Sequence, residues 1–314
     1  ILKGVASNVS QLLVWPLIVS FPLLLTRTST FHHSHFSVPF ASYWGTDSSY
    51  PNPLGLTLGI TAVGVGQLFA ILYQYFHYKT NERTRIQLKK REYGFAEGVF
   101  THLSQPEGFG LMVGYLSVTW MFNILPQEYY SFEGGIRWRE VAMSLVVTDF
   151  LQFVMHQIEH VASPKLYKVS HKPHHRFINP RYFDAFNGSG PDTVLMILVP
   201  LLGCSQIVRN CNVWSYMAFG SLYANWLCLI HCEYVHVWDR AFRILGLGTP
   251  ADHHVHHAFF NYNFGHLFMW WDWILEHTDH RVMNCVREFS RQVYDQASLA
   301  SQPKLRDYLI KGIY

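Results

Sequence analysis

The chain has 314 residues, of which 49% are hydrophobic, 16% aromatic and only 14% charged, with a formal net charge of +3. Soluble domains carry about 25% charged residues, so the composition excludes an ordinary soluble domain, although the chain is too polar to lie wholly within a membrane. The small net charge and the lack of a DNA- or RNA-binding motif argue against a nucleic acid partner.

Hydropathy predicts an all-α, polytopic membrane helical bundle with four spans and a helical hairpin. The apolar stretches lie at about 9–25, 54–76, 108–125 and 139–155, and the two hairpin arms at about 193–208 and 213–230. A single span needs roughly 20 apolar residues, which makes the first four stretches candidates for full spans. The shorter arms of the hairpin either cross obliquely or enter the membrane and return.

Charge predicts the orientation of these spans. Six basic residues crowd the loop after the second span: Lys79, Arg83, Arg85, Lys89, Lys90 and Arg91. The segment 26–53 has only Arg27. The positive-inside rule therefore puts residues 78–107 in the cytoplasm. Counting crossings from there places His156, His231 and the region after residue 237 on the same cytoplasmic face, as a histidine-rich helical cap.

Eleven of the nineteen histidines fall between residues 156 and 257, in four groups. The segments are HQIEH, HKPHH, HCEYVH and HHVHH, and spacings of three or four residues put imidazoles on one face of a helix. Pro173 fits best in the first turn of a helix, so we expect His171 at the helix entrance. The candidate ligands are His156, His160, His171, His174, His175, His231, His236, His253, His256 and His257.

The remaining histidines are interpreted as packing or interfacial side chains. His254 is out of phase with its neighbours, and the FHHSHF segment falls on the opposite membrane face. The others in this class are His77, His102, His266, His277 and His280, among which His266 is the first candidate for an exception.

Ten histidines returning to one face would repel one another if protonated, and metal ions remove that cost. Four ligands close a structural zinc site, so ten ring nitrogens suit two ions. The five cysteines form no CxxC pair and are interpreted as free thiols. With no thiolate in phase and few carboxylates nearby, a pair of irons with open positions for dioxygen is the natural interpretation, although zinc could be present in the isolated protein.

The order HxxxH, HxxHH, HxxHH resembles the fatty acid hydroxylase and sterol desaturase superfamily of integral-membrane di-iron oxygenases. Three flanking segments extend the resemblance over about residues 145–280: DFLQFVMHQIEH, LYKVSHKPHHRFINP and NFG with the following WWDWILEHT. It implies a catalytic region at 108–280, preceded by membrane spans and a basic loop at 1–107 and followed by a polar tail at 281–314.

The resemblance also assigns residues to roles. The eight box histidines become ligands, with His231 and His236 as additional ligands. Asp149, Asn263 and Asp272 become candidates for supporting the ligands by hydrogen bonds. Relatives often space the intervening pair as HxxxH, but position 235 is Val here, so His236 is the least secure ligand.

The family's chemistry implies that iron and dioxygen supply an oxidant for an unactivated C–H bond, with hydroxylation or desaturation as the outcome. Electrons would come from an external cytochrome b-type donor and its reductase, and the basic loop at 79–91 is a candidate docking site. The HxxxH spacing of the first box is more typical of sterol-modifying members, so we expect a sterol or related lipid as substrate. The endoplasmic reticulum is the expected compartment, with a mitochondrial or other organellar membrane as the alternative.

Two other classes of function stay open at this point. A catalytically silent homologue could act as a structural subunit of a larger membrane complex, but such proteins usually lose box histidines and none of the eight is missing. A zinc or proton transporter would need ionisable residues along the spans, and the apolar segments hold almost none at their centres.

Overall fold

The computed structural model describes residues 68, 71–75, 86, 94–103, 106–131, 133–234, 236 and 238–275. Secondary structure in these residues is helical, apart from isolated bridge residues: Leu247 pairs with Phe268, and Tyr234 is a further bridge residue. The long helices are α6 (Pro106–Met121), α7 (Trp138–Val161) and α12 (Val213–Ile230). The shorter ones are α5 (Phe95–Leu103), η1 (Gln127–Tyr130), α8 (Pro164–Val169), α9 (Lys172–His175), η2 (Tyr182–Asp184), α10 (Gly190–Thr193), η3 (Val194–Leu198), α11 (Val199–Ile207), α13 (Asp239–Ile244), α14 (Pro250–Phe259) and α15 (Trp270–Leu275).

The predicted membrane spans are found in part. Two helical stretches are long and apolar enough to cross a membrane, α7 and the continuous stretch Gly190–Ile207. They coincide with the fourth predicted span and the first hairpin arm, and α12 occupies the second arm. Helix α6 has 16 residues, or about 24 Å, which is shorter than the hydrocarbon core of a bilayer. The span at 9–25, the one at 54–76 except residues 68 and 71–75, the basic loop at 79–91 except residue 86, and the tail at 281–314 lie outside the described residues.

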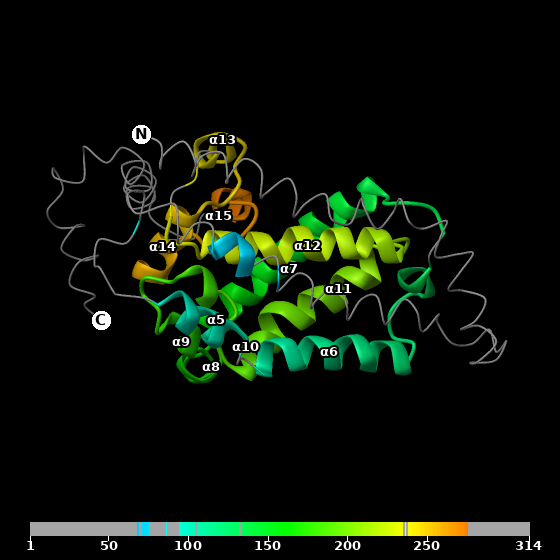
Figure 1. Cartoon of the computed structure of the whole chain (residues 1–314), viewed down its shortest axis with the longest axis horizontal. Coiled ribbons are helices and arrows are strands. Elements are labelled where there is room, and N and C mark those ends of the chain that lie inside the picture. Colours follow the sequence, from blue (N-terminus) through cyan, green and yellow to red (C-terminus); the bar gives the residue numbers. More distant parts are fainter. Residues whose placement is uncertain are drawn as a thin grey trace, which may run out of the picture.

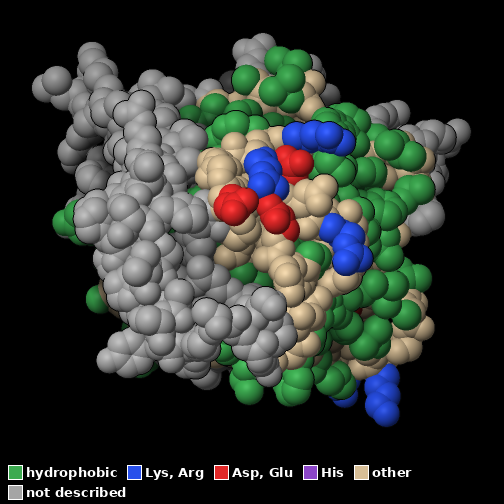
Figure 2. Space-filling model, turned by 90° about the vertical axis from the view of Figure 1, so that its right-hand side faces the viewer, with side chains coloured by type: hydrophobic (Ala, Val, Ile, Leu, Met, Phe, Trp, Pro, Cys, Tyr) green, Lys and Arg blue, Asp and Glu red, His purple; other side chains and the backbone are tan. Residues whose placement is uncertain are grey.

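The long helices run along the length of the molecule, and α7 packs against both α11 and α12 (Figure 1). Helices α8, α9, α14 and α15 gather at one end of this bundle (Figure 1). The opposite end faces the viewer in Figure 2 and shows a small group of acidic and basic side chains within an apolar surface, with no histidine among its described side chains. Arg137 and Glu128 form an exposed ion pair in this part of the chain, at 2.7 Å.

The first arm of the hairpin bends through a π-helical turn, η3, between α10 and α11. Pro200 follows at the start of α11 and has no N–H to donate to the carbonyl four residues earlier, that of Met196. The side chain of Gln152 in α7 donates to that carbonyl instead, at 2.8 Å. The irregular turn thus links the arm to α7 at the level of the histidine-rich end of α7.

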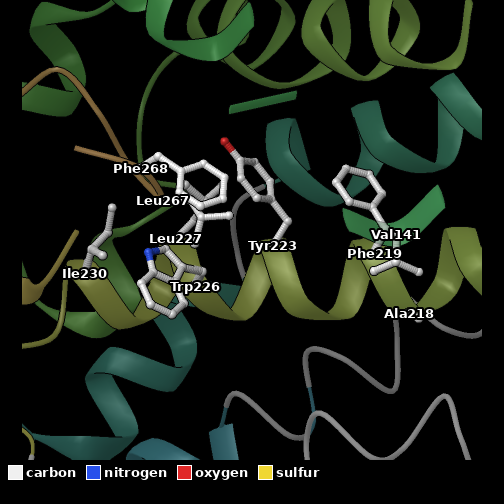
Figure 3. Close-up of a cluster of buried hydrophobic side chains, with 9 residues drawn as sticks. All are labelled: Val141, Ala218, Phe219, Tyr223, Trp226, Leu227, Ile230, Leu267 and Phe268. Carbon is white, nitrogen blue, oxygen red and sulfur yellow. The ribbon is translucent and has the colours of Figure 1, made fainter. Parts of the chain in front are cut away.

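Helix α12 presents its apolar face to the loop that precedes α15. Tyr223, Trp226 and Leu227 lie in a buried cluster with Leu267 and Phe268, and Figure 3 shows these side chains facing one another. Burial of large side chains of this kind stabilises a fold by about 1.5–3 kcal/mol each. The cluster therefore anchors the segment around residues 264–268 to the bundle.

Candidate metal centre

Nine of the ten predicted ligands come together in two groups at the end of the bundle. The five-histidine group contains His156, His160, His171, His175 and His256. The four-histidine group contains His174, His231, His253 and His257. Within each group, one ligand atom from every ring lies within 4.8 Å of all the others. Histidine clusters of this density could hold metal ions.

Local helix geometry places each ring. His156 and His160 lie one turn apart at the end of α7, and His171 is the N-cap of α9 with Pro173 in the first turn, as the sequence predicts. Helix α14 begins with a capping box in which Thr249 and Asp252 exchange hydrogen bonds, and it ends at Phe259, followed by the C-cap residue Phe260 with a φ of 62°. These caps fix the helix that carries three of the ligands.

Backbone carbonyls orient three of the rings. Nδ1 of His156 donates to the Phe264 carbonyl at 2.9 Å, and Nδ1 of His256 donates to the Tyr262 carbonyl at 2.7 Å. Nδ1 of His231 donates to the Leu227 carbonyl at 2.6 Å. A carbonyl only accepts, so each Nδ1 carries the hydrogen. The Nε2 of each neutral ring therefore has no hydrogen, and its lone pair is available to the group.

Hydrogen bonds alone do not satisfy the nitrogens that meet there. Nε2 of His231 lies 2.9 Å from Nε2 of His253 and 3.2 Å from Nε2 of His174, while Nε2 of His257 lies 3.1 Å from that of His253. If Nε2 of His253 carries the hydrogen and donates it to His231, that nitrogen has no lone pair left to accept a hydrogen bond from Nε2 of His257. A cation accepts all of these lone pairs at once, so the donor set fits a metal ion.

Burial keeps these imidazoles neutral. It lowers the pKa of His171 to about 3 and that of His174 to about 4. The pKa values of His253 and His257 also fall well below the usual range, first because of burial and then because of neighbouring imidazoles. Neutral imidazole is the form that binds metal, so the ligands are ready at neutral pH.

Two carboxylates beside His171 were not among the predicted site residues. Nδ1 of His171 donates to Oδ1 of Asp192 at 2.6 Å, and Oε2 of Glu159 lies 3.5 Å from the same nitrogen. Glu159 is fully buried and lies within the first histidine box, next to His160 in sequence, so its position in the sequence could have indicated a role at the site. Asp192 comes 21 residues after His171, and no local pattern connects the two.

The three predicted supporting residues hold the loops around the rings and make no hydrogen bond to an imidazole within the described part of the chain. Asp149 accepts from the N–H groups of Leu267 and Phe268. Asp272 accepts from the N–H groups of Phe264 and Gly265, at 2.8 Å each. The side chain of Asn263, at a positive φ of 56°, donates to the Asp252 carbonyl. Asp272 thereby holds the residue whose carbonyl orients His156.

His236, the tenth predicted ligand, lies in neither group. Its Nε2 is 2.9 Å from the Tyr73 hydroxyl, and its ring stacks on Trp238 at 5.1 Å. His254 is buried beside the Cys232 carbonyl, and His102 packs on Phe183. The histidines at positions 32, 33, 35, 77, 277 and 280 lie outside the described residues.

The chain is similar in sequence to known proteins over the region that carries the histidines. A family model described as fatty acid hydroxylase matches residues 141–277. The chain is also 55% identical over 269 residues to the alternative squalene epoxidase of Phaeodactylum tricornutum, an alignment that covers 84% of this chain and 77% of that protein. The chain belongs to the fatty acid hydroxylase and sterol desaturase superfamily. This confirms the resemblance drawn from the histidine boxes.

More distant members of the superfamily share the central region. The Delta(7)-sterol 5(6)-desaturase of Gibberella zeae is 28% identical over 152 residues, which cover 45% of this chain and 42% of that protein. The Delta(7)-sterol-C5(6)-desaturase of Nicotiana tabacum is 28% identical over 144 residues, covering 42% and 47%. No solved structure matches the chain. Family membership and the two apolar helical stretches together indicate a membrane protein.

Proposed function

We propose that the chain is a di-iron oxygenase that uses dioxygen to epoxidise squalene or a closely similar apolar lipid. The observation that carries this proposal is the convergence of nine histidines on two groups whose nitrogens need a cation. Support for the substrate comes from the 55% identical relative named alternative squalene epoxidase. In this reaction one oxygen atom adds across a carbon–carbon double bond and the other leaves as water, with two electrons from a donor and two protons.

The five- and four-histidine groups would each hold one iron, and the pair of irons would supply the dioxygen activation that side chains cannot provide. The chain's own residues orient and shield this chemistry. Phe264 packs edge-on against His156 and His160, with ring centroids 5.3 and 5.2 Å apart, and Phe260 packs against His175 at 4.8 Å. Aromatic rings in these positions exclude water from the five-histidine group.

A lipid substrate would approach by His160. Of the nine rings, only that of His160 is not fully buried. Val161, the next residue at the end of α7, is 76% exposed, and Val169 is 55% exposed in α8, the helix whose Tyr167 packs against His160. An apolar rim beside the one accessible ring suits a hydrocarbon without polar groups. Val161→Glu should therefore raise KM for squalene and leave the iron content unchanged.

Metal analysis and product analysis test the proposal together. Protein purified in mild detergent should contain about two irons per chain, whereas a His174→Ala, His256→Ala variant, with one change in each group, should lose them. The control is His254→Ala, which removes a buried imidazole of the same helix outside both groups. With labelled dioxygen, reductant and squalene, the product should carry one labelled oxygen per epoxide.

Other outcomes separate the alternatives. Desaturation of a sterol without retained label would favour the activity named in the desaturase relatives. Absence of metal, or metal binding indifferent to His174 and His256, would contradict the proposal and favour a structural subunit of a membrane complex.

Electron supply is also part of the proposal. We propose that a cytochrome b-type protein and its reductase deliver the electrons at the cytoplasmic face of the endoplasmic reticulum, with a mitochondrial or other organellar membrane as the alternative. The basic loop at 79–91 suits an acidic donor surface. Reversing three of its charges should lower donor-dependent turnover, with no effect on turnover driven by a small-molecule reductant.

A further inference from the structure

A tenth histidine, His266, lies between the two histidine groups. Its ring centroid is 4.8 Å from that of His156 in the five-histidine group and 5.3 Å from that of His253 in the four-histidine group. The residue is only 5% exposed. It belongs to no histidine box, and it comes from the loop before α15 rather than from a helix that carries the other ligands.

The imidazole of His266 is buried without the hydrogen bonds that usually accompany burial. Its Nδ1 is inaccessible to solvent and has no partner in the described part of the chain. Most buried polar side-chain atoms have a partner, and leaving one without a partner costs about 1–3 kcal/mol. His254, equally buried in the preceding helix, α14, has the Cys232 carbonyl within reach. His266 shares the buried Nδ1 without a partner with His253 and His257, members of the four-histidine group, and this links it to the candidate ligands.

The backbone of His266 is held from both sides. Trp226 donates its indole N–H to the His266 carbonyl at 3.1 Å, and Asp149 accepts from the two following N–H groups. Gly248 lies against the same carbonyl so closely that a Cβ at this position would collide with it. These contacts fix the backbone that carries the ring between the two groups.

We propose that His266 is an additional metal ligand at the junction of the two histidine groups, where its ring lies nearest that of His156. This inference rests on the proposed function, since it assumes that both groups hold metal. It accounts for the position of the ring between the two groups and for the buried nitrogen without a partner. It also replaces His236, which the spacing HCEYVH suggested as the tenth ligand and which lies against Tyr73 instead.

The test compares His266→Ala with His236→Ala in the detergent-purified protein. His266→Ala should lose about half of the iron and change the electron paramagnetic resonance spectrum of the nitric oxide adduct, and added imidazole should restore both. His236→Ala should retain both irons and the wild-type spectrum. If His266→Ala fails to fold, His266→Gln keeps most of the side-chain volume and should show the same loss of iron.

Other results overturn the inference in distinguishable ways. Two irons and an unchanged spectrum in the folded His266 variant would reduce His266 to a packing residue and leave the proposed function intact. Loss of iron from His236→Ala, with retention in the His266 variant, would restore His236 as the tenth ligand. Wild-type protein without iron would refute the proposed function itself.

Discussion

Asp149 is the buried acceptor that fixes the loop after the last histidine box, and replacing it by asparagine tests this role. Oδ1 accepts from the Leu267 N–H at 2.8 Å and from the Tyr223 hydroxyl at 3.1 Å. Oδ2 accepts from the Phe268 N–H at 3.0 Å and from the Trp271 indole at 2.9 Å. Four donors thus converge on one carboxylate that has no exposed surface.

The cost of Asp149→Asn follows from these partners. In Asp149→Asn the side-chain NH2 group replaces one of the two oxygens, and the Oδ1 position tolerates it better. There the Tyr223 hydroxyl can turn to accept a hydrogen bond from the NH2 group, whereas the Leu267 N–H can only donate and loses its acceptor. One buried N–H is then left without an acceptor, which costs about 1–3 kcal/mol. We expect a loss of about 2 kcal/mol in the free energy of unfolding, or roughly a 30-fold change in the ratio of folded to unfolded protein.

The same change should weaken metal binding. The loop supplies the Phe264 carbonyl that orients His156, and loss of such supporting contacts typically lowers metal affinity by about 10–100-fold. Bound iron stabilises the folded state by mass action, so the gain in Tm on adding iron should shrink in Asp149→Asn. The measurement is thermal unfolding in mild detergent, with and without iron.

Asn212 provides a matched control at the opposite end of the bundle. Its side chain also makes four buried or half-buried hydrogen bonds: it donates to the Glu133 and Gly135 carbonyls and accepts from the N–H and hydroxyl of Ser215. Asn212→Ala removes a helix cap, so it should lower the free energy of unfolding by about 1–2 kcal/mol and lower Tm accordingly, but leave the gain in Tm from iron unchanged. An equal gain from iron in wild type, Asp149→Asn and Asn212→Ala would refute the reasoning.

Three further predictions concern the rings and their surroundings. Asp192→Asn should lower iron affinity about 10–100-fold in a chelator competition, because Asp192 accepts from His171 and keeps that ring basic; wild-type affinity would show that the contact is dispensable. Gly248→Ala should destabilise the protein severely, because the added Cβ meets a backbone oxygen. Gly220→Ala, with open space around it, should be neutral or stabilising in thermal unfolding. Similar Tm values for the two variants would contradict the packing described. Finally, the metal-free protein should lose stability as the pH falls below about 6.5. His171 and His174 have pKa values of about 3 and 4 when folded, so between these values and 6.5 the unfolded chain binds more protons, and each ring lowers the free energy of unfolding by about 1.4 kcal/mol per pH unit. A denaturation midpoint constant between pH 7 and pH 5 would argue against buried neutral rings.

The sequence predicts the helices well where apolar residues are continuous. The stretch 139–155 and the arm 213–230 correspond to α7, Trp138–Val161, and α12, Val213–Ile230. Hydropathy ends α7 six residues early because His156, Glu159 and His160 are polar, although the helix continues through them. The polar end of α7 packs against other histidines, and a hydropathy profile contains no information about such contacts between distant segments.

The site is predictable where spacing places two ligands on one helix, and unpredictable where contacts join distant segments. The boxes at 156–160, 171–175 and 253–257 meet as the helical spacing suggests. His236 fits no helical spacing with His231, and its neighbour is Tyr73, 163 residues earlier in the chain. Asp192 reaches His171 through the bend after α9, which no periodicity in the sequence indicates.

Several carboxylates lie near the two histidine groups, and the proposed pair of metal ions would give them a role. Nine imidazoles cannot offset the charge of two divalent cations, and an uncompensated charge in a buried site is costly. Glu159, Asp192 and Asp149 are buried, and Asp272 partly buried, around the rings or the loops that hold them. These four acids lie one layer away, where they can balance the cations without occupying coordination positions. Their removal should therefore weaken metal binding more than the removal of the same number of acids from the opposite end of the bundle, where Glu128 is paired with Arg137 at the surface.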